Sequence, residues 1–224
     1  MKQKKILSLL WKAILIACSA IGTALLLYHS HDALATLSYF TTLSNLVVIG
    51  FFAWLFVRTF IGKKNDTGRI MFLKGGVSVG IILTGLVYNL LLRPFLLDAD
   101  FGYDPRTIQD VLVHVVTPLM VALDFILFDV KGIIRKTAPL FWLIYPAGYW
   151  IYILIYNAFG GRFEGSGHVL SPYPYFFMNI PEYGPWGALI VAVFVVGIGY
   201  GLYGIDRWGY RLAQKKAKAG AQDA

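Results

Sequence analysis

The chain contains few charged residues and almost no cysteine. Only 14% of its 224 residues are charged, whereas a soluble domain has about 25%. Cys18 is the single cysteine, so an intrachain disulfide is impossible. Hydrophobic residues make up 58% of the chain, and the mean hydropathy is +0.64. These values exclude an ordinary soluble domain and predict one polytopic membrane domain over residues 1–224.

Several ligand-binding motifs are also missing. The sequence has no His-Glu-x-x-His pattern and no CxxC pair, which are typical of zinc sites. His29, His31 and His168 lie in predicted loops and could approach His114, but their spacing fits no known metal motif. There is no glycine-rich phosphate loop after a strand. We therefore expect no metal and no cofactor.

Apolar runs of about 20 residues recur along the whole chain, and each is long enough to span the roughly 30 Å hydrocarbon layer of a membrane. They predict an all-α bundle of six transmembrane helices, because a lipid-exposed backbone has to satisfy its own hydrogen bonds. The predicted helices cover residues 6–28, 37–60, 70–92, 108–128, 138–158 and 185–205.

The net charge of +8 is distributed very unevenly between the two sides of the predicted bundle. One side carries Lys2, Lys4, Lys5, Lys12, Arg58, Lys63, Lys64, Arg69, Lys74, Lys131, Arg135, Lys136, Arg207, Arg211, Lys215, Lys216 and Lys218. The other side carries only Arg93, Arg106 and Arg162. The positive-inside rule then predicts that both termini are cytoplasmic. The charge is explained by topology, so we expect the bilayer as a partner and no nucleic acid.

Two polar residues lie at matching depths in different spans. Thr42 is about five residues into the second helix and His114 about six into the fourth, and both helices run inward. At 1.5 Å per residue, both residues lie roughly 8–9 Å below the outer interface. A hydroxyl and an imidazole brought together there would form a nucleophile and its base.

The local spacing adds two supporting residues. Asp110 is four residues before His114, so the two share a helix face, and its carboxylate would fix the imidazole tautomer as in a triad. Asn45 is three residues after Thr42 and would orient the hydroxyl or donate to an oxyanion.

Further polar and aromatic residues lie at the outer ends of the third and fifth helices. Asn89 is predicted to support the site. Arg93, Tyr149 and Tyr156 are predicted to bind substrate, and an arginine suits a substrate carboxylate.

Each of these residues also has a structural interpretation. A membrane threonine often bonds the carbonyl four residues before it, and histidine or asparagine side chains join helices. Asp110 would be favoured in a first helical turn by the helix dipole. The fifth loop, residues 159–184, is long and aromatic, and is interpreted either as a lid or as an interfacial anchor.

Two short motifs carry a family resemblance. They are Tyr39-Phe40-Thr41-Thr42-Leu43-Ser44-Asn45 and Leu112-Val113-His114-Val115-Val116-Thr117-Pro118. In these motifs and in its span layout, the chain resembles the androgen-induced and androgen-dependent family of intramembrane threonine hydrolases, and its bacterial relatives most closely. The resemblance implies a threonine nucleophile, for which we favour Thr42 over the adjacent Thr41, and His114 as the catalytic histidine.

The resemblance further implies hydrolysis of lipid esters, with fatty acid esters of hydroxy fatty acids as the family substrate. The expected location is the cell membrane of a bacterium. Two alternatives remain open. One is a transporter or small-molecule binding protein with an outward-facing polar pocket, in which Asp124 would be the ionisable step deeper in the bundle. The other is a structural membrane protein whose polar groups join helices.

Overall fold

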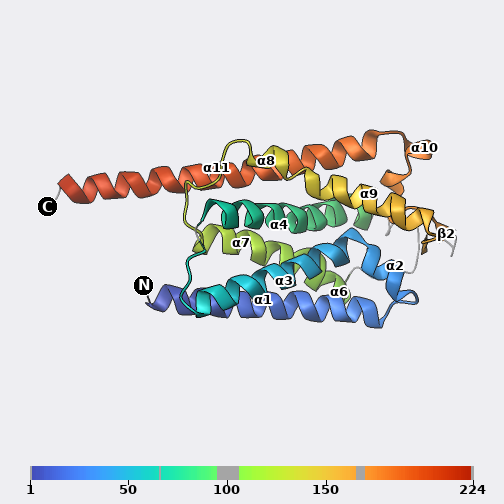
Figure 1. Ribbon diagram of the computed structural model, residues 1–224, viewed down its shortest axis with the longest axis horizontal. Coiled ribbons are helices and arrows are strands. Elements are labelled where there is room, and N and C mark those ends of the chain that lie inside the picture. Colours follow the sequence, from blue (N-terminus) through green and yellow to red (C-terminus); the bar gives the residue numbers. More distant parts are fainter. Residues whose placement is uncertain (1, 66, 95–105, 165–169, 223–224) are drawn as a thin grey trace.

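A computed structural model describes residues 2–65, 67–94, 106–164 and 170–222. Six helices are long and apolar enough to cross a membrane, which confirms the predicted all-α membrane bundle. These spans are Lys2–Tyr28, Phe40–Phe60, Gly68–Leu92, Ile108–Phe128, Ala138–Ala158 and Trp186–Ala219. Both termini lie at the same end of the bundle (Figure 1), as an even number of spans requires. The prediction that this end is cytoplasmic remains a prediction.

The second span differs from its prediction at its start. Helix α1 (Lys2–Tyr28) is followed by the short helix α2 (Ala33–Ser38), whose N-terminus is capped by the Asp32 carboxylate through the backbone N–H groups of Leu34 and Ala35. Tyr39 is extended, with φ −67° and ψ 142°, so a new helix, α3 (Phe40–Phe60), begins after it. The predicted continuous helix over 37–60 is therefore interrupted at Tyr39, and residues 37 and 38 belong to α2.

The third and fourth spans each contain one π-helical turn. Helix α4 (Gly68–Val87) runs into the π-helix η1 (Tyr88–Leu92). The fourth span consists of α6 (Ile108–Val111), the π-helix η2 (Leu112–Val116) and α7 (Thr117–Phe128). Each π-turn ends two residues before a proline, Pro94 or Pro118. A proline has no N–H to donate, so the regular hydrogen-bond ladder has to change at these points.

The fifth span is broken and the sixth is longer than predicted. Helices α8 (Ala138–Phe141) and α9 (Ile144–Ala158) are separated by a turn at Trp142 and Leu143. The strands β1 (Phe163–Glu164) and β2 (Leu170–Ser171), the 3-10 helix η4 (Phe176–Met178) and helix α10 (Ile180–Tyr183) follow. Helix α11 covers Trp186–Gln222 and not 185–205, because the extra segment lacks proline and is rich in alanine and lysine, which favour helix.

Helix α4 is the centre of the bundle. It contacts α3, α7 and α11, and α1 packs against both α3 and α7 (Figure 1). Its span is also the most deeply buried of the six. The inward-facing side chains of α3, α7 and α11 therefore pack against α4.

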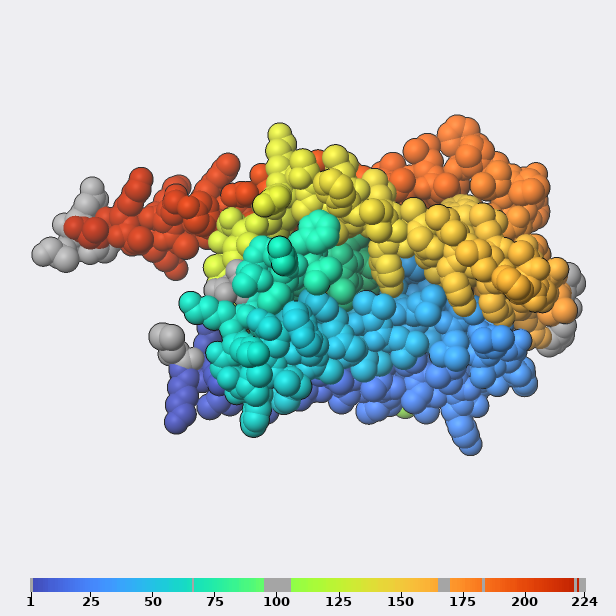
Figure 2. Space-filling view, in the orientation of Figure 1, coloured from blue at the N-terminus to red at the C-terminus, as the bar shows by residue number. Residues whose placement is uncertain are grey.

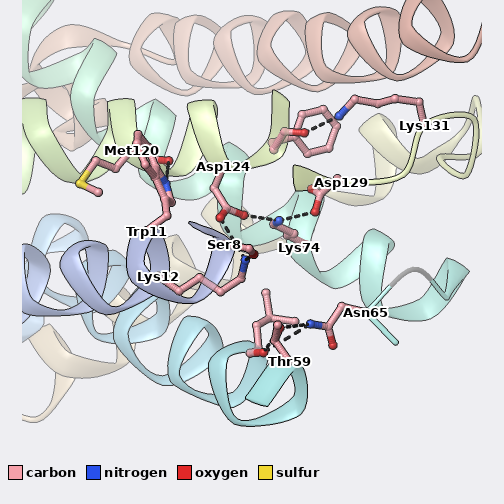
Figure 3. A network of polar contacts seen from close by, with 12 residues as sticks. Ser8, Trp11, Lys12, Thr59, Asn65, Lys74, Met120, Asp124, Asp129 and Lys131 are labelled. Carbon is pink, nitrogen blue, oxygen red and sulfur yellow. Dashed lines mark hydrogen bonds and ion pairs between the residues drawn. The ribbon is translucent and has the colours of Figure 1, made fainter. Parts of the chain in front are cut away.

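A buried cluster of four charged side chains joins α1, α4 and α7 near the end of the bundle that carries both chain termini (Figure 3). Asp124 of α7 accepts hydrogen bonds from Lys12 of α1 at 3.2 Å and from Lys74 of α4 at 2.5 Å. Lys74 also pairs with Asp129 at 2.5 Å. Asp124 has no exposed surface, and both lysines are buried. Lys12 and Lys74, which belong to the positively charged side of the sequence, are thus neutralised inside the protein.

A second buried carboxylate anchors α11 to the segment after α7. The Asp206 carboxylate accepts hydrogen bonds from the backbone N–H groups of Gly132 at 2.8 Å and Ile134 at 3.2 Å. The neighbouring Arg207 donates to the Ile134 carbonyl at 2.9 Å. These contacts fix the point at which α11 leaves the bundle.

The ionic cluster predicts a strong dependence of stability on Asp124. In Asp124→Leu, Lys74 would keep Asp129 but the buried Lys12 would lose its carboxylate partner, so we expect the free energy of unfolding in detergent to fall by about 3–5 kcal/mol. In the double variant Lys12→Met with Asp124→Leu, the remaining Lys74 and Asp129 form a matched pair, and most of the loss should be recovered. Equal unfolding temperatures for wild type and Asp124→Leu would contradict a stabilising role.

Candidate active site

The π-turn η2 leaves backbone carbonyls without their usual partners. The Thr117 N–H bonds the Leu112 carbonyl, whereas in an α-helix it would bond that of Val113. Pro118 has no N–H to offer the carbonyl of His114. Two asparagine side chains donate to these oxygens, Asn89 to His114 at 3.1 Å and Asn45 to Val113 at a longer 3.5 Å. The backbone that carries His114 is thus held by both α3 and the third span.

Two glycines allow the neighbouring helices to approach η2 closely. A Cβ atom at Gly22 of α1 would lie 2.8 Å from Leu112 Cβ, and one at Gly85 of α4 would lie 3.0 Å from the His114 carbonyl oxygen. The Tyr88 ring also contacts η2. It stacks on the His114 imidazole, with ring centroids 3.5 Å apart and an interplanar angle of 6°. The ring plane of His114 is therefore fixed.

The imidazole lies between a hydroxyl and a carboxylate. Nε2 of His114 is 3.2 Å from Oγ1 of Thr41, and Nδ1 is 3.4 Å from Oδ1 of Asp110. The second contact is close, but its geometry is too poor for a good hydrogen bond. The other Asp110 oxygen accepts from Thr107 at 2.5 Å. Because the carboxylate faces Nδ1, we expect the proton there, which leaves Nε2 to accept from Thr41.

The hydroxyl that contacts His114 is thus that of Thr41, and not that of Thr42, the residue predicted from the sequence. Thr42 is only 1% exposed and is buried in the bundle. The helix break at Tyr39 explains the shift, because α3 begins at Phe40 with its own rotation about the helix axis. The direction in which each threonine faces therefore depends on this break.

Thr41 also lines a small apolar cavity of about 50 Å³. The wall includes Phe40, Tyr88, Tyr149 and Trp150. A volume of this size holds a few water-sized groups. It is a place for a reacting group beside the hydroxyl and not for a whole lipid.

The fifth loop covers this cavity. Tyr175, Phe177 and Met178 line the cavity wall, and the Tyr175 ring packs edge-on against Tyr39 at 5.9 Å. Burial raises the pKa of the Tyr175 phenol, while contacts with the Thr41 side chain and with the backbone of Thr41 and Phe40 lower it by less. The phenol therefore stays protonated, and it lies at the start of α3. Nothing in the sequence pattern placed this residue beside Thr41.

Three other predicted site residues, Tyr149, Asn45 and Asn89, lie close to Thr41 or His114. Tyr149 lines the cavity, and its hydroxyl donates to the Ser38 carbonyl at 3.0 Å. Asn45 and Asn89 support the backbone and not a reacting atom, since Asn45 also donates to the Thr41 carbonyl at 2.9 Å.

Two predicted substrate-binding residues lie away from the cavity wall. Tyr156 packs against Phe163 at 5.3 Å and against Tyr152. Arg93 is half-buried just after η1, and none of the described polar contacts joins it to Thr41 or His114. His168, named above with the other histidines, is outside the described residues.

No protein-family model, curated protein or solved structure matches the chain.

The support of the His114 carbonyl by Asn89 can be tested by rescue. Asn89→Leu leaves this buried oxygen without a donor, which should lower the free energy of unfolding by about 1–3 kcal/mol. Adding Pro118→Ala restores a backbone N–H close to the same oxygen and should recover part of the loss. Chemical unfolding of the two variants in detergent measures both effects. If Pro118→Ala only added to the loss, the proline would be needed for packing and not for the freed carbonyl.

Proposed function

We propose that this protein is an intramembrane hydrolase of lipid esters, in which Thr41 is the nucleophile and His114 its base. The observation that carries the proposal is the 3.2 Å contact between Thr41 Oγ1 and His114 Nε2, beside an apolar cavity and within membrane-spanning helices. A hydroxyl is a weak nucleophile unless an adjacent base accepts its proton.

The chemistry would proceed in two halves. His114 takes the Thr41 proton as Oγ1 attacks the ester carbonyl, and the tetrahedral intermediate expels an alcohol that receives the proton from the imidazole. Water then attacks the acyl-threonine, again with His114 as base, and releases the carboxylic acid. Asp110 would stabilise the imidazolium that forms in each half.

The start of α3 offers stabilisation for the oxyanion. The first backbone N–H groups of a helix have no partner within the helix, and Thr41 lies in this first turn. Tyr175 lines the same cavity as Phe40 and Thr41. A substrate oxygen would bind at the start of α3, either beside the Tyr175 phenol or in its place. Binding there requires a movement of the fifth loop.

The proposed substrate is an ester with long hydrocarbon chains. The cavity wall is apolar and comes mostly from membrane-spanning helices, with the fifth loop completing it, and a lipid ester at this depth would be delivered by the bilayer. The resemblance to the androgen-induced family narrows the proposal to fatty acid esters of hydroxy fatty acids, and to the cell membrane of a bacterium. Both of these narrower statements rest on the resemblance.

A transporter or small-molecule binding protein is the second candidate, and the buried charges of Lys12, Lys74, Asp124 and Asp129 favour it. A path across the membrane would pass this cluster. In the described structure, however, Asp124 is held by two lysines and has no exposed surface. Solute flux into proteoliposomes that Asp124→Asn abolishes would support transport.

The adjacent threonines provide a matched pair of variants for the hydrolase. Thr41→Ala should abolish labelling by a fluorophosphonate probe and hydrolysis of a long-chain ester, whereas Thr42→Ala should retain both. His114→Gln should reduce turnover by about 10²–10⁴-fold, because general-base catalysis contributes this much.

The comparison requires equal folding, measured as thermal unfolding of each purified variant. Loss of labelling in Thr42→Ala with normal labelling of Thr41→Ala would restore the assignment favoured by the sequence. Normal turnover in both variants would contradict a threonine nucleophile in this motif.

A further inference from the structure

Helix α9 is joined to α2 and α3 by a row of tyrosine hydroxyls. Tyr145, Tyr149 and Tyr152 occupy positions i, i+4 and i+7, so they share one helix face. The Tyr145 hydroxyl lies 3.1 Å from Ser44 Oγ and that of Tyr152 lies 2.7 Å from Ser38 Oγ. Tyr149 donates to the carbonyl of the same Ser38. We call this contact the tyrosine seam.

A groove of about 320 Å³ lies along the tyrosine seam. Besides the tyrosines it is lined by Phe40, Leu43, Ile144 and Gly148, and none of its lining residues is charged. Ile144 is 73% exposed on a membrane-spanning helix, so at this depth the medium outside the groove is hydrocarbon. Figure 2 shows the face of the molecule on which α9 lies over α3.

The groove and the Thr41 cavity share a wall. Phe40 and Tyr149 line both spaces, and their rings pack edge to face with centroids 5.0 Å apart. The cavity of about 50 Å³ on one side touches the nucleophile, and the groove of about 320 Å³ on the other side opens toward lipid. Their sizes suit a reacting group and a chain, respectively.

We propose that the groove between α3 and α9 binds a hydrocarbon chain of a bilayer lipid, and that Phe40 and Tyr149 are the gate through which the attached ester reaches Thr41. The occupant follows from the chemistry of the walls. The groove offers apolar surface and no charge, and the tyrosine hydroxyls that border it bond to serines. The passage to Thr41 rests on the proposed hydrolase function, whereas chain binding in the groove does not.

A large side chain introduced at Gly148 would fill the groove. Gly148 is part of a regular helix, and a Cβ added there meets no heavy atom within 4 Å, so a larger side chain can branch from this position into the groove. Gly50 of α3 is the matched control, because it is equally open and does not line the groove. The test is a comparison of Gly148→Trp with Gly50→Trp, each reconstituted in vesicles of phosphatidylglycerol and phosphatidylethanolamine.

The first readout needs no enzymatic activity. A phospholipid with a diazirine near the middle of one acyl chain is photolysed in the vesicles, and crosslinked peptides are identified by mass spectrometry. We expect crosslinks to the segment of Tyr145–Tyr152 in wild type and in Gly50→Trp. In Gly148→Trp they should fall at least about tenfold, equivalent to about 1.4 kcal/mol of binding free energy.

The second readout is hydrolysis. Gly148→Trp should lose turnover of a long-chain ester in vesicles but retain that of a short, water-soluble ester, whose chain does not need the groove. Equal crosslinking at the seam in both tryptophan variants would overturn the proposal, as would normal long-chain turnover in Gly148→Trp. Crosslinking that Gly148→Trp abolishes, in a wild-type protein that hydrolyses neither ester, would instead contradict the hydrolase function and leave the groove as a lipid site.

Discussion

The geometry of the candidate site depends on how two free carbonyl oxygens of η2 are satisfied. An unbonded carbonyl within a membrane costs several kcal/mol, so the break at His114 and Pro118 is tolerated only if neighbouring helices supply donors. Asn45 and Asn89 supply them from two directions. The same contacts fix the height and rotation of His114. The π-turn η2, together with the two asparagine side chains that bond to its carbonyls, thus determines where the imidazole lies relative to Thr41.

Polar groups are divided between the two ends of the bundle. At the end that carries the termini, Lys12, Lys74, Asp124 and Asp129 balance one another in number of charges and join three elements. At the other end, the buried groups around Thr41 are hydroxyls, amides and the imidazole, with Asp110 as the nearby carboxylate. A bundle whose ionic cluster is remote from the site can keep its helices in register while the loop above the cavity moves.

The sequence predicted the six spans because their hydrophobic length is a local property, and residues 108–128 were predicted with the observed limits. From matched depth it predicted that Thr42 would meet His114, whereas the structure places Thr41 beside the imidazole. The rotation of α3 about its axis is set at the break at Tyr39, and the sequence pattern did not indicate this break. The contribution of Tyr175 was not predictable either, since a loop more than a hundred residues away in the chain has to fold back. Asn89 was expected near the site, but its role was not, because Pro118 indicates a change in the hydrogen-bond ladder without showing which side chain donates to the freed carbonyl.

The length of α11 has a consequence for the positive charge of the chain. Its 37 residues correspond to about 55 Å of helix, against roughly 30 Å of hydrocarbon. The helix continues straight past its anchor at Asp206 and leaves the bundle as a projecting arm (Figure 1). Lys218 is therefore about 18 Å beyond that anchor along the axis. Since electrostatic attraction decays over about 8 Å at physiological ionic strength, the lysines at the tip of the arm take no part in the charge balance inside the bundle.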